Sequence, residues 1–99
     1  EAVAQFVYRA VLETGALVAA LEGIDALVFT GGIGEHAVAV RARICEKLGW
    51  LGIQLHPAAN AGNALHISTT ASRVAVCVIP TDEEAVIAAH THRLLRTTA

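Results

Sequence analysis

Two short apolar segments, each followed directly by residues typical of a turn or a helix start, most restrict the fold of this chain. Residues 25–30 and 73–79, apart from their polar ends, lack the polar alternation of a half-exposed strand. Such runs are typical of strands buried on both faces. A helical pattern separates them, and two strands of one sheet that are joined through a helix run parallel. We therefore predict an α/β fold with helices layered on a mainly parallel sheet.

Apolar residues spaced three and four apart predict three helices. The first starts at the beginning of the chain and ends at Gly23, and the second runs from Glu35 to Leu48 and ends at Gly49. The third follows residues 81–84 and runs to about Leu95. Residues 51–65 are predicted to be irregular, with at most a short strand at 53–55. In the second helix the predicted buried face is Ala37, Val40, Ile44 and Leu48, and the side chains predicted largely outside it are Arg41, Arg43, Glu46 and Lys47.

The length and composition indicate one small soluble domain. Of 99 residues, 55% are hydrophobic and only 4% aromatic, which suffices for one core and is too little for two. A net charge of −2 without a basic run argues against nucleic-acid binding. The longest wholly apolar stretches, such as residues 15–21, are far shorter than the roughly 20 residues that span a bilayer. We expect a cytoplasmic protein with no membrane partner.

The cysteines and the first residue indicate the context of the chain. Cys45 and Cys77 lack CxxC spacing, so we interpret them as buried thiols in a reducing compartment, with a disulfide as the alternative. Glu1 is not an initiator methionine, and no capping residue precedes the first helical period. We therefore expect a fragment of a longer protein.

A glycine-rich turn directly follows the first predicted strand. Its residues are Gly31, Gly32, Ile33, Gly34 and Glu35, with His36 beside them. Glycines without a Cβ let a ligand approach the backbone, and a following helix start offers unpaired amides. A tight turn between a strand and a helix explains the glycines about equally well. The helix dipole alone accounts for Glu35, and His36 is either a ligand contact or a neutral surface histidine.

Acidic side chains follow the second predicted strand. Thr81-Asp82-Glu83-Glu84 matches a capping box, which accounts for Thr81 and Glu84 without any function. It does not account for Asp82 or Glu83, whose carboxylates are ligands that Mg²⁺ accepts. The alternative is that the helix dipole favours acids here. Because open α/β sheets bind ligands at the carboxyl ends of their strands, we expect this motif and the glycine turn to be neighbours.

These motifs, in this order, resemble the carboxyl-terminal part of the acetate kinase family. Residues 25–35 resemble the family's glycine turn, and residues 76–84 resemble its closing motif. Leu51-Gly52-Ile53 and Ile67-Ser68-Thr69 resemble its intervening segments. Two positions depart from the family's usual asparagines, namely His36 and Asp82.

The resemblance implies a fold, a reaction and a set of contacts. The family belongs to the actin-like kinases, which clamp a nucleotide between two ribonuclease-H-like domains. Residues 1–99 would then form the carboxyl-terminal part of the second, nucleotide-binding domain, a partial ribonuclease-H-like unit. The family reaction converts ATP and acetate to ADP and acetyl phosphate, in a homodimer. By resemblance Glu83 would bind Mg²⁺, this piece would hold no catalytic residue, and ATP or ADP would contact Gly31, Gly32, Ile33, Gly34, Glu35 and His36.

Three other functions compete with this interpretation. A propionate or butyrate kinase would share these motifs, because nothing within these residues is expected to line the acyl pocket. A non-enzymatic dimerisation module is the second alternative. A relative of the sugar kinases or chaperone-type ATPases is a weaker third.

Overall fold

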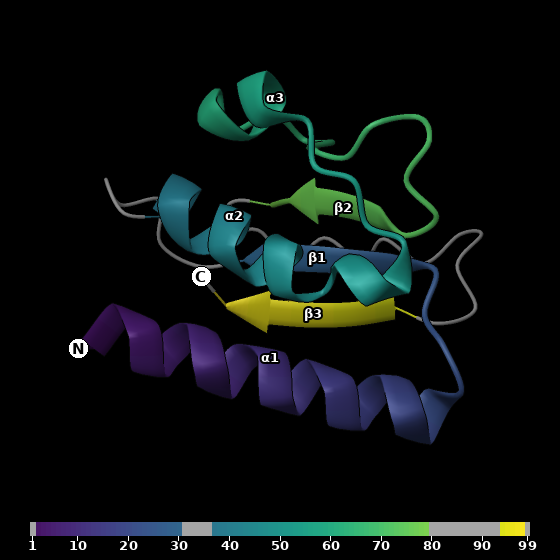
Figure 1. Cartoon of the computed structure of the whole chain (residues 1–99). Helices are drawn as coiled ribbons and strands as arrows, with labels where there is room; N and C mark the ends of the chain where they lie inside the picture. Colours follow the sequence, from purple (N-terminus) through teal and green to yellow (C-terminus); the bar gives the residue numbers. More distant parts are fainter. Residues whose placement is uncertain (1, 31–36, 80–93, 99) are drawn as a thin grey trace.

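The computed structural model describes residues 2–30, 37–79 and 94–98. Helices and strands alternate along most of this length, with helices packed on a central sheet (Figure 1). The elements are α1 (Ala2–Leu21), β1 (Ala26–Thr30), α2 (Ala37–Lys47), a 3-10 turn η1 (Gly49–Leu51), α3 (Pro57–Ala61), β2 (Ala75–Val78) and β3 (Leu94–Thr98).

The sheet has the strand order β2-β1-β3, and both outer strands run parallel to β1. Ala26 pairs with Ala75 on one side of β1 and with Leu94 on the other. Leu27, Val28 and Phe29 are each at most 1% exposed, as expected for a strand buried on both faces. The predicted parallel α/β sheet is confirmed.

Two extended segments continue the sheet beyond β2. The backbone N–H of Ile67 donates to the carbonyl oxygen of Val76 at 2.9 Å, and His66 forms an antiparallel bridge with Cys77. The next segment pairs through the N–H of His56, which donates to the carbonyl oxygen of Ile67 at 2.7 Å. The outer edge of β2 is therefore hydrogen-bonded. The short strand predicted at 53–55 is present only as an isolated bridge between Leu55 and Ser68.

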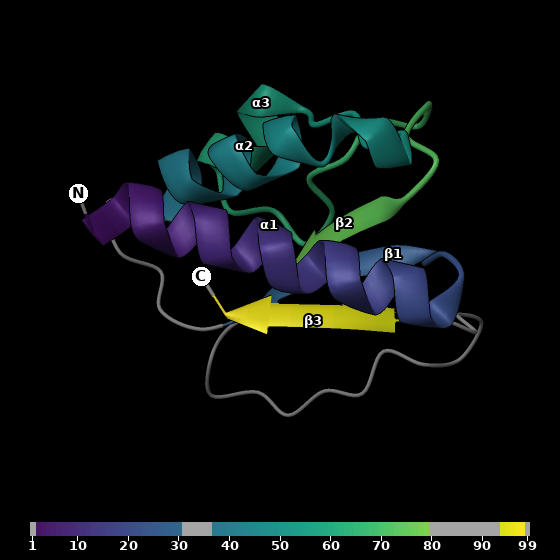
Figure 2. The ribbon, with the colours of Figure 1, turned by 60° about the horizontal axis from the view of Figure 1, so that its bottom comes forward.

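Helices α1 and α2 lie on the same face of the sheet (Figure 2). Their buried side chains form one core with the side chains that β1 and β2 direct to that face. Complete burial of such a side chain stabilises the fold by about 1.5–3 kcal/mol. The opposite face of the sheet buries a smaller cluster of Val28, Cys77 and Ile79. The main core includes Val7, Val18, Leu27, Phe29, Val40, Ile44, Leu48, Ile67 and Val76.

Helix α1 ends as predicted at Gly23, through two backbone hydrogen bonds. Gly23 donates to the carbonyl oxygen of Val18 at 2.9 Å, and Glu22 donates to that of Ala19 at 3.4 Å. Both residues of this cap have positive φ, 65° at Glu22 and 129° at Gly23, so the left-handed turn begins at the glutamate and continues into the glycine.

Of the described helices, α1 is long and apolar enough to cross a membrane by length and composition alone. Its side chains Val7, Ala10, Thr14 and Val18 are buried in this fold. The core helix of a soluble protein passes the same test, so the finding is weak evidence for a membrane span.

The prediction that the last helix runs to Leu95 is wrong, because Leu94 and Leu95 open strand β3. Apolar periodicity suggested the helix, but the segment ends in Thr97 and Thr98, whose branched side chains favour strands. Pairing with β1 also satisfies the backbone groups along the second edge of that strand. The capping box of residues 81–84 lies outside the described residues.

The second helix ends before Gly49 as predicted, since α2 ends at Lys47. A separate 3-10 turn follows, and the left-handed residue is Gly52 after η1, with a φ of 86°. One prediction for this segment is wrong. The stretch predicted as irregular contains α3, whose first turn is preorganised by Pro57 and capped by His56. The Nδ1 of His56 accepts the N–H of Ala59 at 3.1 Å, a cap that the usual Ser, Thr, Asp or Asn pattern does not reveal.

Candidate functional site

The carboxyl ends of β1 and β2 lie side by side at one edge of the sheet. Phe29 pairs with Val78, and the backbone N–H of Ile79 donates to the carbonyl oxygen of Phe29 at 2.9 Å. The chain therefore leaves both strands from neighbouring positions, as predicted for the two strand ends. The candidate ligand residues themselves, Gly31, Gly32, Ile33, Gly34, Glu35, His36 and Glu83, lie outside the described residues.

The first turn of α2 begins near the same edge. Only residues 31–36 connect Thr30 at the end of β1 to Ala37 at the start of α2. Helix starts carry unpaired backbone amides and a partial positive charge, both of which favour phosphate. Ala37 and Val40 are buried in the fold, so this end of the helix is held by packing.

Arg41, predicted to lie largely outside the core, is instead 1% exposed. Its Nε donates to Oδ1 of Asn60 at 2.7 Å, and its Nη2 donates to the carbonyl oxygen of Asn60 at 3.0 Å and to Oδ1 of Asn63 at 2.5 Å. Burial lowers the pKa of the Arg41 guanidinium, and the nearby Cys45 raises it by a smaller amount. The prediction failed because α3 and the turn after it cover this side of α2 and supply the acceptors.

Asn60 also binds the start of α2 directly. Its Nδ2 donates to the carbonyl oxygen of Val38 at 3.0 Å, and its side chain is 2% exposed. The sequence pattern placed Asn60 and Asn63 only in a stretch predicted to be irregular. A buried arginine cannot be recognised from helical spacing when its partners lie about 20 residues further along the chain.

Both cysteines are free and buried, which confirms their interpretation as buried thiols. Burial raises the pKa of Cys45 to about 12, against a smaller lowering effect of Arg41. Burial also raises the pKa of Cys77, whose Sγ lies 3.4 Å from Nδ1 of His66. Thiols protonated at neutral pH are poor nucleophiles and metal ligands. Within residues 2–30, 37–79 and 94–98, no three His, Cys, Asp or Glu side chains are grouped as a metal site.

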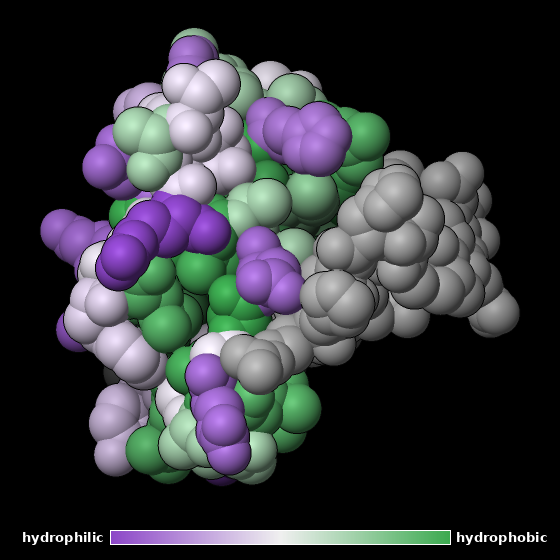
Figure 3. Space-filling model, turned by 90° about the vertical axis from the view of Figure 1, so that its right-hand side faces the viewer, coloured by the Kyte–Doolittle hydropathy of each residue, from purple (hydrophilic) through white to green (hydrophobic). Residues whose placement is uncertain are grey.

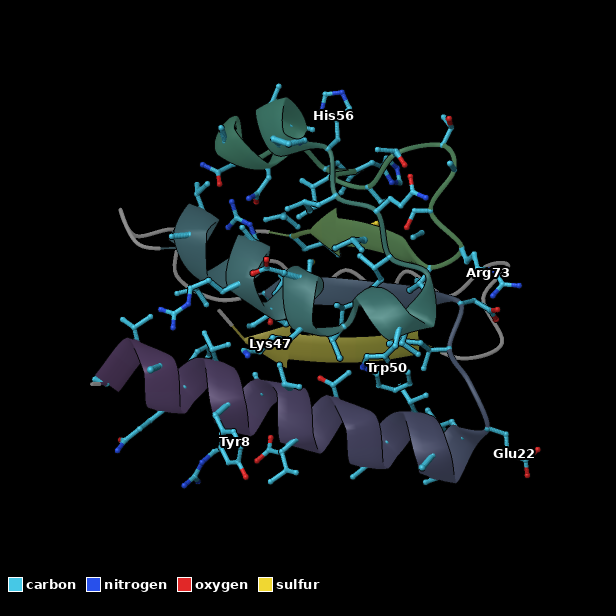
Figure 4. All side chains as sticks on the ribbon, in the orientation of Figure 1. Tyr8, Glu22, Lys47, Trp50, His56 and Arg73 are labelled. Atoms are coloured by element: carbon cyan, nitrogen blue, oxygen red, sulfur yellow. The ribbon has the colours of Figure 1, made fainter. Side chains whose placement is uncertain are left out.

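Helix α1 carries exposed large apolar side chains on two sides, Tyr8 and Leu12 opposite its buried stripe and the others beside it, here together called the α1 exposed set. Tyr8 is 68% exposed and points away from the sheet (Figure 4). Trp50 on η1 is 64% exposed, so neither of these two aromatics is buried in the core. Apolar surface is also open between scattered polar side chains on the side of the molecule where α1 ends (Figure 3). The α1 exposed set consists of Phe6, Tyr8, Leu12, Leu17 and Leu21.

The chain is similar in sequence to known acetate kinases over nearly all of its length. The acetate kinase of Rhizobium meliloti is 61% identical over 93 residues, which are 94% of this chain and 24% of that protein. The acetate kinase of Rhodopseudomonas palustris strain TIE-1 is 55% identical over 96 residues, 95% of this chain and 24% of that protein. The chain thus spans about a quarter of the length of these curated relatives.

Solved structures agree with the sequence comparison. The acetate kinase of Porphyromonas gingivalis is 38% identical with a TM-score of 0.72, over 82% of this chain and 21% of that one. A propionate kinase from Francisella tularensis is 35% identical with a TM-score of 0.71, over 84% of this chain and 21% of that one. A model of the acetokinase family matches residues 1–89. The resemblance is therefore confirmed, and this chain belongs to the acetokinase family.

Proposed function

We propose that this chain forms the carboxyl-terminal, nucleotide-binding part of an acetate kinase. The observation that supports it best is the placement of the two strand ends. The 2.9 Å hydrogen bond from Ile79 to Phe29 makes the segments after β1 and β2 start beside each other. The glycine turn and the acidic motif can then approach one ligand from two sides, as ligand sites in open α/β sheets require.

In the proposed reaction, a carboxylate oxygen of acetate attacks the γ-phosphorus of ATP. The bond from that phosphorus to the bridging oxygen breaks, and ADP and acetyl phosphate result. Catalysis of such a transfer depends mainly on positioning and on stabilising charge. We assign residues 31–36 and the first turn of α2 to the nucleotide, because backbone amides there can donate to phosphate oxygens.

The acidic motif suits Mg²⁺, which the family uses with its nucleotide. Magnesium prefers oxygen ligands and commonly takes one or two carboxylates together with phosphate oxygens and water. In the part of the chain that the structure describes, no acidic cluster competes for this role. We assign Glu83 to the ion, which would supply positive charge against the phosphates when bound.

The chain alone is expected to bind nucleotide without turning it over. It matches about a quarter of the length of its relatives, and phosphoryl transfer needs groups on both sides of the cleft. The longer protein is expected to be a cytoplasmic homodimer. We propose acetate as the acyl substrate because the curated relatives described above, at 61% and 55% identity, are acetate kinases.

A segment exchange tests the proposal. In the chimera, this chain replaces the matching 93-residue segment of the Rhizobium meliloti acetate kinase. Acetyl phosphate is measured as its hydroxamate, with the parent enzyme and the isolated chain as references. We expect turnover by the chimera and none by the isolated chain. A chimera with native circular dichroism but no turnover would contradict the nucleotide-binding role and favour a dimerisation module. Turnover by the chain alone would contradict its role as one part of the enzyme.

A further inference from the structure

The strongest unexplained feature of the described residues is the burial of Arg41 among neutral partners. Its partners are oxygens of Asn60 and Asn63, and within residues 2–30, 37–79 and 94–98 none of its hydrogen bonds goes to a carboxylate. A buried cation loses its hydration, and neutral oxygens replace it less completely than a carboxylate would. An apolar residue of similar size often stabilises a core as well or better. Stability alone therefore does not account for an arginine here.

The geometry of the contacts points to alignment instead. The guanidinium is a planar fork, so hydrogen bonds from both Nε and Nη2 fix its orientation as well as its position. Both of these nitrogens bind Asn60, at 2.7 Å and 3.0 Å. The amide of the same Asn60 donates to Val38. Two attachments one turn apart, at Val38 and Arg41, therefore hold the start of α2 against α3.

The attached turn is the part of α2 next to the glycine turn. Val38 is the second residue of the helix, and no residue separates Ala37 from the segment 31–36. A rotation or shift of this helix end would move the amides assigned to phosphate. Displacements of about 1 Å can change the rate of an enzyme by two orders of magnitude.

We propose that Arg41, held by Asn60 and Asn63, is a positioning residue that aligns the first turn of α2 for nucleotide binding. The inference rests on the proposed function. It predicts that loosening the network weakens binding of ATP more than it weakens the fold, and leaves acetate binding unchanged.

Asn63 offers a clean substitution because its side chain is exposed and its φ is 53°. Glycine adopts that φ readily, so Asn63→Gly removes one acceptor from Arg41 without backbone strain. Asn63→Asp keeps an oxygen at the same place, tolerates the same φ and adds a negative charge beside the cation. Arg43 is a matched control on the same helix, because it is only half-buried and makes none of these hydrogen bonds.

The test uses the chimera with Asn63→Gly, Asn63→Asp, Arg41→Met and Arg43→Met. We expect Asn63→Gly and Arg41→Met to raise KM for ATP about fivefold or more, with KM for acetate within about twofold. Asn63→Asp and Arg43→Met should keep both constants within about twofold of the unsubstituted chimera. Unchanged KM for ATP in Asn63→Gly and Arg41→Met, with only a lower Tm, would overturn the inference.

Hydrogen exchange of the chimera gives a second readout that does not depend on activity. The amides of Arg41 and Ala42 close the first hydrogen-bonded turn of α2 and should exchange faster in Asn63→Gly than in Arg43→Met. Equal exchange in these two variants would also overturn the inference. Failure of the proposed function is distinguishable, because the unsubstituted chimera would then be inactive whatever the exchange pattern shows.

Discussion

The backbone N–H of Ile79 donates to the carbonyl oxygen of Phe29 at 2.9 Å. This contact lies at the last paired positions of β2 and β1, where Val78 faces Phe29. The segments that leave the two strands therefore start as neighbours, although about 50 residues separate them in the chain. The proposed nucleotide site depends on this adjacency.

The first prediction concerns the glycine turn. In the chimera, Gly32→Val should raise the apparent KM for ATP, because a branched side chain obstructs close approach of the nucleotide to the backbone. Its circular dichroism should remain close to that of the unsubstituted chimera. The opposite outcome is a variant that is largely unfolded, with normal ATP binding by the molecules that remain folded. That result would show that the glycine serves only the geometry of the turn.

The second prediction concerns the two glycines around η1. Gly52 has a φ of 86°, and an added Cβ would come within 2.4 Å of the Cδ of Arg73. Gly52→Ala should therefore lower the free energy of unfolding by about 1–2 kcal/mol. Gly49 has no atom within 4 Å of an added Cβ, so Gly49→Ala is the control and should change stability by less than about 0.5 kcal/mol. Urea unfolding of the chimera measures both, and equal losses would contradict the strain at Gly52.

The third prediction follows from the buried thiol of Cys45. Its pKa is about 12 in the folded chain against an ordinary value of 9.0. When the pH lies between these two pKa values, the thiol is deprotonated in the unfolded chain and protonated in the folded chain. The free energy of unfolding therefore falls as pH rises, by up to about 1.4 kcal/mol per pH unit. Urea unfolding at pH 8 and pH 10.5 should show a larger loss for the chimera than for its Cys45→Ala variant. Equal losses would contradict the raised pKa.

The fourth prediction is that the isolated chain associates. The reason is the α1 exposed set, because so many large apolar side chains exposed on one helix favour contact with another chain. Unpaired edges of β1, an alternative cause, are not present, since β2 and β3 pair with it on both sides. Light scattering over a tenfold concentration range should show dimers or larger species. Leu12→Glu with Leu17→Glu should reduce them, and a monodisperse unsubstituted monomer would contradict the prediction.

The parts of the fold that the sequence predicted are those with strong local patterns. The unbroken apolar run around Leu27 and Phe29 correctly predicted a doubly buried strand, and three-and-four spacing correctly predicted α1 and α2. The failures depend on partners distant in sequence. Arg41 is buried because α3 covers it, and β3 is extended because β1 offers a strand edge.

The site was predicted only as far as the strand ends. The order of strand, turn and helix correctly placed the carboxyl ends of β1 and β2 together. The network of Arg41, Asn60 and Asn63 was missed, because the local pattern assigns Arg41 to the surface of a helix and the two asparagines to an irregular stretch. The assignments to residues 31–36 and to Glu83 remain predictions.

The magnesium dependence of the chimera with Glu83→Ala tests the central claim most directly, with Glu84→Ala as the matched control. Glu83 is assigned to the ion, whereas Glu84 at the third position of the predicted helix is expected to fold back onto the cap amide. Glu83→Ala should fold normally and lose most turnover or need far more Mg²⁺. Glu84→Ala should mainly lower Tm, for a loss of about 1 kcal/mol. The reversed pair of effects would exchange the two roles, and near-normal magnesium dependence in both variants would contradict a metal site in this chain.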